Sequence, residues 1–243
     1  MKIEYNLISR GTELQSDCEG YMAISEMIDG KRYILPLKHS VKNTDLVIDG
    51  SLIVKKQLSI YQIAVARFML ISKLFLDRIK IKKNERILVV GCGCVGFSLL
   101  EYLYLNGYTN ARFVSKNIKY TKFNEEKNSI EGYSWIFDCT GNNSAIKSIL
   151  TKCQPMTNIV LMGTPREKPD VDLLTIHRKN LIVFGAHELT GFDSKKRQNA
   201  FDKIVNILSM KNEKYEDVCE FVKNKSQISV KCNKIYFIIK KSD

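Results

Sequence analysis

The stretch Arg86-Ile-Leu-Val-Val-Gly-Cys-Gly-Cys-Val-Gly96 decides the fold that this sequence predicts. The four apolar residues 87–90 are typical of a strand that is buried on both faces of a sheet. Three glycines follow them, and the run 97–105 then carries apolar residues at helical spacing. The stretch therefore predicts a buried strand, a tight glycine turn and a helix, in that order.

Each glycine has a separate task in such a turn. Gly91 would permit the tight turn, Gly93 would let the backbone approach a pyrophosphate, and Gly96 would let the helix pack closely on the sheet. The first amides of the helix, at Cys94 and Val95, would then face phosphate oxygens at the positive end of the helix dipole. Because the glycines stand between a strand and a helix, they predict a dinucleotide-binding site.

Strands and helices alternate on both sides of this turn. Further buried strands are expected at 112–114, 134–138, 158–162 and 180–184, with helices at 95–105, 144–153 and 171–177. A long apolar helix, with Ser59 as its N-cap, precedes them and ends near Ile79. The fold class is therefore α/β, a Rossmann fold with a doubly wound parallel sheet covered by helices.

The two ends of the chain predict a second, smaller domain. Before residue 58, short alternating segments are separated by Asp29-Gly30 and Asp49-Gly50, which are typical of hairpin turns. After Ser194 we expect helices at 194–210 and 215–223 and a closing strand at 234–239. The predicted division is a dinucleotide-binding domain at 59–204 and a small β-rich domain made of 1–58 with 205–243.

Composition sets limits on the function. The chain has 243 residues, 44% hydrophobic and 26% charged, and lacks both a secretory signal and the roughly 18 consecutive apolar residues of a membrane helix, so we expect a cytoplasmic protein that does not enter a membrane. The net charge of +12 is spread along the chain, which does not favour a nucleic-acid partner. The seven cysteines show neither a disulfide framework nor zinc-binding spacing, so reduced thiols are expected.

The choice between NAD and NADP is expected at the end of the second strand, where NAD enzymes carry an acid that holds the ribose 2′-hydroxyl. This strand instead ends in Ser115 and Lys116, with Lys119 close behind. A hydroxyl and cations suit a 2′-phosphate, so the sequence favours NADP(H) over NAD(H).

Residues 85–188 resemble the cofactor domain of the medium-chain dehydrogenase/reductase superfamily, the relatives of zinc alcohol dehydrogenases. Three stretches carry the resemblance: 87–96, Trp135-Ile-Phe-Asp-Cys-Thr-Gly141 and Asn158-Ile-Val-Leu-Met-Gly163. The resemblance implies that the nicotinamide half of the cofactor lies near Cys139, Thr140, Gly141 and Gly163. The stretch Leu181-Ile-Val-Phe-Gly185 resembles the sixth strand of the family, which implies a homodimer formed through the Rossmann sheet.

The N-terminal segment Ile8-Ser-Arg-Gly-Thr-Glu13 resembles the start of the GroES-like catalytic domain of the same family. Arg10 stands where zinc enzymes have their first cysteine ligand, so the resemblance implies a zinc-free member. This form is weakly similar to bacteriochlorophyllide hydroxyethyl dehydrogenases. Because the glycine turn comes earlier than is usual in the family, the GroES-like domain is expected to be truncated.

Without zinc, a side chain must exchange the proton that accompanies hydride transfer. The candidates are Tyr21 and His39, with Lys38 beside the histidine, because all three belong to the small N-terminal domain. The leading hypothesis is an NADP(H)-dependent, zinc-free dehydrogenase or reductase that acts on a carbonyl, alcohol or activated alkene of a small metabolite. The alternatives are a non-catalytic dinucleotide-binding or oligomer-forming protein and, less favoured, an S-adenosylmethionine methyltransferase.

Overall fold

The computed structural model describes residues 2–8, 22–26, 31–36, 50–116, 122–127, 129–165, 168, 170–228 and 235–239. The chain divides into two compact units, one made of Met1–Leu70 with Leu189–Asp243 and the other of Ile71–Glu188. No helix within the described residues is long and apolar enough to cross a membrane.

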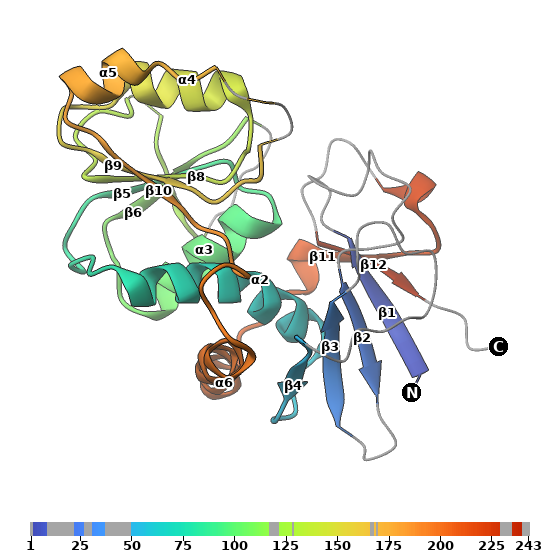
Figure 1. Cartoon of the computed structure of the whole chain (residues 1–243). Coiled ribbons are helices and arrows are strands. Elements are labelled where there is room, and N and C mark those ends of the chain that lie inside the picture. The colour runs from blue at the N-terminus through green and yellow to red at the C-terminus, as the bar shows by residue number, and fades with distance from the viewer. Residues whose placement is uncertain are drawn as a thin grey trace. The chain divides into compact units, whose positions relative to one another are not determined.

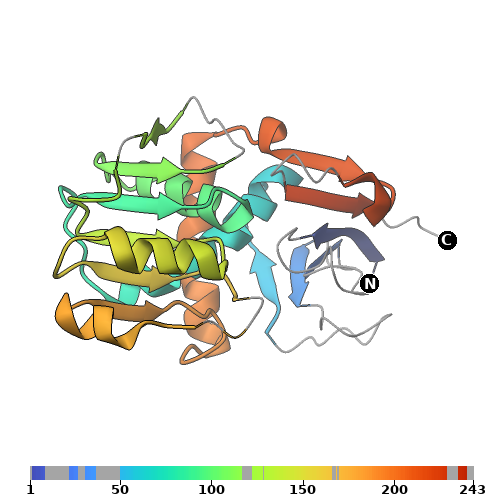
Figure 2. The ribbon, with the colours of Figure 1, turned by 90° about the horizontal axis from the view of Figure 1, so that it is seen from above.

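The unit Ile71–Glu188 contains a six-stranded sheet in which every pair of neighbouring strands is parallel (Figures 1 and 2). Its strands are β5 (Ile87–Val90), β6 (Ala111–Val114), β7 (Asn124–Glu125), β8 (Trp135–Asp138), β9 (Asn158–Leu161) and β10 (Ile182–Gly185). They are arranged in the order β10-β9-β8-β5-β6-β7, which is the doubly wound Rossmann order. The predicted fold class is confirmed, and the strand order reverses between β5 and β8.

Helices cover both faces of this sheet (Figure 1). On one face lie α3 (Cys94–Leu105) and the later part of α2 (Ile60–Arg78), and on the other lie α4 (Asn143–Lys152) and α5 (Leu173–Arg178). Alternate residues of each strand serve the two faces: Val89 and Phe137 pack toward α2 and α3, whereas Leu88 and Ile136 pack toward α4. This two-sided burial explains why the strands are continuous apolar runs in the sequence.

The start of α2 confirms Ser59 as its N-cap. The backbone N–H of Gln62 donates to Ser59 Oγ at 3.2 Å, and the backbone N–H of Ser59 donates to Gln62 Oε1 at 2.9 Å. This reciprocal pair is a capping box, which satisfies two backbone donors that the first turn of a helix leaves without an internal partner. The hydroxyl and amide at this spacing therefore fix where the helix begins.

The other unit contains a second six-stranded sheet, in the order β11-β12-β1-β2-β3-β4. Its strands are β1 (Lys2–Ile8), β2 (Met22–Glu26), β3 (Arg32–Pro36), β4 (Leu52–Val54), β11 (Cys219–Val222) and β12 (Ile235–Ile239). All of its pairs are antiparallel except β11 with β12, which is parallel. The sheet thus joins strands from both ends of the chain.

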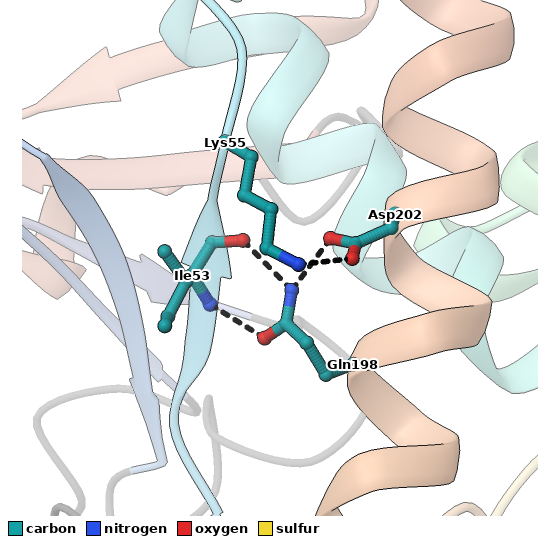
Figure 3. A network of polar contacts seen from close by, with 4 residues as sticks. All are labelled: Ile53, Lys55, Gln198 and Asp202. Atoms are coloured by element: carbon teal, nitrogen blue, oxygen red, sulfur yellow. Dashed lines mark hydrogen bonds and ion pairs between the residues drawn. The ribbon is translucent and has the colours of Figure 1, made fainter.

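Helix α6 (Ser194–Lys211) closes the β4 edge of this sheet (Figure 3). Gln198 lies on α6 with its side-chain amide against the backbone of Ile53 in β4. Asp202, one turn further along α6, accepts from Gln198 Nε2 at 2.7 Å and from Lys55 Nζ at 2.5 Å. A side chain therefore occupies the hydrogen-bonding edge where a further strand could otherwise pair.

The prediction of a helix at 215–223 is wrong. This segment forms a short 3-10 turn, Glu216–Val218, followed by strand β11. Phe221 of β11 contacts the rings of Tyr5 and Tyr61, each with a centroid distance of 5.5 Å, and its backbone pairs with β12. These contacts with distant parts of the chain favour the extended form over the local helical pattern, which covers only two turns. The helix predicted at 194–210 is confirmed as α6.

Candidate dinucleotide-binding site

The glycine turn lies at the carboxyl end of β5, where the strand order reverses. The backbone N–H of Gly91 donates to the carbonyl of Val114 at the end of β6, at 2.9 Å. On the other side of β5, the N–H of Cys139 donates to the carbonyl of Val90, also at 2.9 Å. The turn is therefore fixed between the ends of β6 and β8, at the position where doubly wound sheets bind their ligands.

Two of the three glycines in the turn are required by the packing. Gly91 has a φ of +87°, and a Cβ added to it would lie 2.5 Å from Thr140 Cγ2. A Cβ added to Gly96 would lie 1.9 Å from the carbonyl oxygen of Gly91. Gly96 therefore lets α3 approach the turn at a distance that no other residue permits.

Gly93 differs from the other two because the space beside it is open. A Cβ added at Gly93 would have no described heavy atom within 4 Å outside its chain neighbours. Gly93 is the N-cap of α3, no described side chain caps this helix end, and the first turn contains no acid. The first amides of a helix have no partner within it and attract anions, so this end of α3, with Cys94 and Val95, suits a pyrophosphate.

The loop after β8 is built around Asp138, whose side chain is fully buried. Oδ1 accepts from the backbone N–H of Thr140 at 3.0 Å and from its hydroxyl at 2.6 Å, and Oδ2 accepts from the N–H of Gly141 at 3.3 Å. Burial raises the pKa of Asp138, and the hydrogen bonds from Thr140 and Gly141 act in the opposite direction. Sequence reasoning missed this residue, although an acid that ends an apolar strand before Thr-Gly signals such a loop.

The loops after β8 and β9 contact each other backbone to backbone. The N–H groups of Met162 and Gly163 both donate to the carbonyl oxygen of Asp138, at 2.9 Å each. A Cβ at Gly163 would lie 2.3 Å from the nitrogen of Gly141, and one at Gly141 would lie 2.1 Å from the carbonyl oxygen of Thr164. The glycines therefore keep the space between the two loops free of side chains.

Two cysteines of the site, Cys92 and Cys139, have surroundings that disfavour the thiolate form. Cys92 and Cys94 are buried, and burial raises the pKa of both the Cys92 and the Cys139 thiol. The thiolate is the form that binds metals and attacks electrophiles, so these sulfurs suit packing and their backbone amides suit binding. Within the described residues, no three or more histidine, cysteine or acidic side chains form a group that could hold a metal ion.

The structure brings most of the predicted binding residues together and leaves others outside its description. A connected set of close contacts across the ends of β5, β8 and β9 joins Gly91, Gly96, Cys139, Thr140, Gly141 and Gly163. Ser115, half-buried, and Lys116, exposed, follow β6 directly after the carbonyl that Gly91 contacts. Tyr21, Lys38 and His39, the candidates for proton exchange, lie outside the described residues, as does Arg10.

No protein-family model matches the sequence, and no curated protein matches it. Solved structures do match. Galactitol-1-phosphate dehydrogenase from Escherichia coli aligns over 98% of this chain and 91% of its own, with a TM-score of 0.75 and 12% identity. YhfP of Bacillus subtilis with NAD bound aligns over 98% of this chain and 89% of its own, with a TM-score of 0.70 and 13% identity. TarJ of S. aureus in complex with NADPH aligns over 98% of this chain and 90% of its own, with a TM-score of 0.67 and 16% identity.

A parallel, doubly wound sheet and a second, mainly antiparallel sheet together form the fold of these solved dehydrogenase structures. The resemblance to medium-chain dehydrogenases seen in the sequence is therefore confirmed at the level of the fold. At 12–16% identity these structures establish the fold, and the activity has to be argued from the site. The weaker similarity to bacteriochlorophyllide hydroxyethyl dehydrogenases stays a prediction.

Proposed function

We propose that this chain is an NAD(P)(H)-dependent oxidoreductase that transfers hydride to or from a carbonyl, alcohol or activated alkene of a small metabolite, without zinc. One observation carries the proposal. At the switch point of the sheet, no described atom fills the space beside Gly93 at the start of α3, whereas the glycines on either side of it are held by close contacts. This is the arrangement that a bound pyrophosphate requires.

The residues of the site divide into two groups by what each would do. The amides at the start of α3 would bind the pyrophosphate, and the backbone of Cys139–Gly141 with Gly163 would orient the nicotinamide half. The cofactor, when bound, supplies the hydride or accepts it. Tyr21 or His39 is proposed to exchange the proton with the substrate oxygen or carbon. The division into a cofactor domain at 59–204 and a catalytic-type domain of 1–58 with 205–243 belongs to the same proposal.

NADP(H) is the favoured cofactor, because Ser115 and Lys116 follow β6 and offer a hydroxyl and a cation for a 2′-phosphate. One observation favours NAD(H) instead. Glu125 of β7 pairs with Phe113 of β6, and its charge adds to burial, the larger cause, in raising the pKa of the Cys92 thiol in the glycine turn. The carboxylate of Glu125, on the third strand of this sheet along the chain, therefore acts electrostatically on the glycine turn. Among the similar structures, TarJ is in complex with NADPH and YhfP has NAD bound.

A homodimer through the Rossmann sheet and a cytoplasmic location complete the proposal. β10 is an edge strand of its sheet, and Ile182 and Val183 within it are 52% and 40% exposed. Leu173 and Leu174 on α5 are also exposed apolar side chains of this unit. An apolar edge strand left in solvent is an aggregation hazard, which a second copy would cover. Ile182→Lys should convert a dimer to monomers in sedimentation analysis.

The second candidate function is a non-catalytic dinucleotide-binding protein, which would use the same site without turnover. An S-adenosylmethionine methyltransferase is less favoured, because the close contact between Gly96 and Gly91 is the helix-on-turn packing of a dinucleotide site. Turnover of carbonyl substrates with NADPH separates the first candidate from the second.

The decisive test is fluorescence titration of the purified chain with NADPH and NADH, repeated on Gly93→Asp. The variant places a carboxylate where the pyrophosphate would lie, in a space with no described atom to displace, so binding should be lost while the fold persists. Ser194→Asp is the matched control, because it adds the same charge at the first residue of α6, outside the compact unit Ile71–Glu188 that contains the glycine turn. If wild type binds neither nucleotide, the oxidoreductase proposal is wrong.

A further inference from the structure

We propose that Asp138 is a positioning residue that fixes the nicotinamide end of the site through two loops at once, without touching the cofactor. The inference rests on the proposed dinucleotide-binding function. It concerns a residue at the carboxyl end of β8 whose side chain is fully buried and whose oxygens all accept hydrogen bonds from the surrounding backbone or from Thr140.

The side-chain hydrogen bonds of Asp138 hold the loop that follows its own strand. Both carboxylate oxygens of Asp138 are used by residues two and three positions later, so the loop is held against its own strand. The Thr140 hydroxyl, which donates to Asp138, also accepts from the backbone N–H of Asn142 at 3.0 Å. Asn142 in turn caps α4 by accepting from the N–H of Ala145 at 3.2 Å. One carboxylate thus anchors a chain of contacts that ends at a helix start.

The loop after β9 is held by the backbone of the same residue. The backbone carbonyl of Asp138 holds the N–H groups of Met162 and Gly163, and Gly163 lies directly on Gly141. Since no side chain lies between these glycines, a shift of one loop displaces the other. Five donors therefore bond to Asp138: three come from the loop after β8 and two from the loop after β9.

Asp138 is too deeply buried to contact a ligand directly. Its side chain has no exposed surface, so any effect on a bound dinucleotide must pass through the peptide groups of Cys139–Gly141 and Gly163. These groups lie at the end of the strands beside the glycine turn, and the pyrophosphate-binding start of α3 is a separate element. Loss of the hydrogen bonds to the Asp138 side chain should therefore weaken contacts with the nicotinamide half of the cofactor and leave contacts with the adenosine half unchanged.

The test compares wild type, Asp138→Asn and Asp172→Asn. Asparagine keeps the shape of the side chain but replaces an acceptor oxygen with a donor NH2, which faces backbone or hydroxyl donors. Asp172 is the matched control, because it accepts from the N–H of Thr175 at 2.9 Å and from its hydroxyl at 2.5 Å, at the start of α5. The probes are NADPH and 2′,5′-ADP, or NADH and ADP if wild type prefers NADH.

Asp138→Asn should bind the dinucleotide about tenfold more weakly, the change expected for one lost hydrogen bond to a charged group. It should bind the adenosine-half probe as wild type does, and Asp172→Asn should match wild type for both probes. Equal weakening of both probes by Asp138→Asn, or no weakening of either, would overturn the inference. If wild type itself binds no dinucleotide, the proposed function fails first.

A second pair of variants tests the same inference if Asp138→Asn does not fold. Thr140→Val keeps the shape of the side chain and removes the hydroxyl that donates to Asp138 and accepts from Asn142. Thr175→Val, which removes the equivalent hydroxyl donor to Asp172 at the start of α5, is the matched control. Thr140→Val should lower the ratio of dinucleotide to adenosine-half affinity, and Thr175→Val should leave it unchanged. Identical ratios in the two variants would contradict the proposed role.

Discussion

The side-chain amide of Gln198 forms two hydrogen bonds with the backbone of Ile53: its Oε1 accepts from the N–H at 2.8 Å, and its Nε2 donates to the carbonyl at 2.9 Å. An amide side chain thus takes the place of a neighbouring strand at the open edge of β4, as Figure 3 shows. The same Nε2 reaches Asp202, which also pairs with Lys55. The contact joins residues 145 positions apart in the sequence.

Removal of this amide should destabilise the unit that contains β4 and α6. Gln198→Ala leaves the N–H and the carbonyl of Ile53 without their partner, and we expect the free energy of unfolding to fall by about 1–3 kcal/mol. Urea denaturation measures the change. Asn206→Ala, at an exposed position on the same helix, is the control and should change stability by less than about 0.5 kcal/mol. Equal effects of the two substitutions would show that the contact with Ile53 adds nothing.

The glycines of the turn should respond differently to the same small substitution. Gly96→Ala drives a methyl group into the carbonyl of Gly91, and we expect about 2–3 kcal/mol of destabilisation together with loss of dinucleotide binding. Gly93→Ala meets no described atom within 4 Å, so the thermal unfolding midpoint should stay near that of wild type while NADPH binding weakens. A stable Gly96→Ala variant that binds NADPH normally would contradict the packing described above.

Much of this site could be predicted from the sequence, because its signals are local. The apolar run 87–90, the glycines that follow it and the helix after them are contiguous in the sequence. Each segment can be predicted from its own residues, without knowledge of distant contacts. Asp138 was missed because its role depends on Met162 and Gly163, which reach it from another strand. β7 was missed because two polar residues carry no strand pattern. β11 was predicted as helix because its partner, β12, lies in a later segment.

The thiols of the site should be unreactive in the native state at neutral pH. Burial raises the pKa of Cys92 and Cys139 above the ordinary value of 9.0, so the native state retains these protons more tightly than the unfolded chain. Well below pH 9, both thiols are protonated in the native and the unfolded state, so they add no pH dependence to the free energy of unfolding. As pH rises past 9, the unfolded chain loses these protons first, and the free energy of unfolding should fall. Iodoacetamide at pH 7.5, followed by mass spectrometry, should label both residues only after denaturant is added. Rapid labelling of the native protein would refute this.

Lys116 should contribute to the choice of cofactor if NADP(H) is preferred. Lys116→Glu replaces a cation after β6 with an acid, and the ratio of NADPH to NADH affinity should fall by about tenfold or more, because a charge beside a phosphate is reversed. Lys127→Glu, which makes the same charge change on another surface lysine of this unit, is the control. The ratio is measured by parallel fluorescence titrations. An unchanged ratio would place the 2′-phosphate contact elsewhere and would direct attention to Ser115 and Glu125.

Lys179 should stabilise the end of α4 through its ammonium group. Nζ donates to the carbonyls of Leu150, Thr151 and Cys153, at 3.1, 2.7 and 2.8 Å. The last carbonyls of a helix have no partner within it and carry a partial negative charge, so a cation there satisfies both needs. Lys179→Met keeps the apolar stem and removes all three donors. We expect about 1–3 kcal/mol of destabilisation and faster amide exchange in the last turn of α4.

The control for this prediction is Lys147→Met, an exposed lysine within α4 that should change stability by less than about 0.5 kcal/mol. Hydrogen exchange locates the effect, because loss of the cap should speed exchange near Cys153 and leave the first turn, capped by Asn142, at the wild-type rate. Since that first turn is connected to Asp138 through Thr140, unchanged exchange there would also indicate that the nicotinamide end of the site is held independently of the far end of α4. Equal acceleration at both ends would instead mean that α4 opens as a single cooperative unit, and that Lys179 contributes to the geometry of the site from a distance.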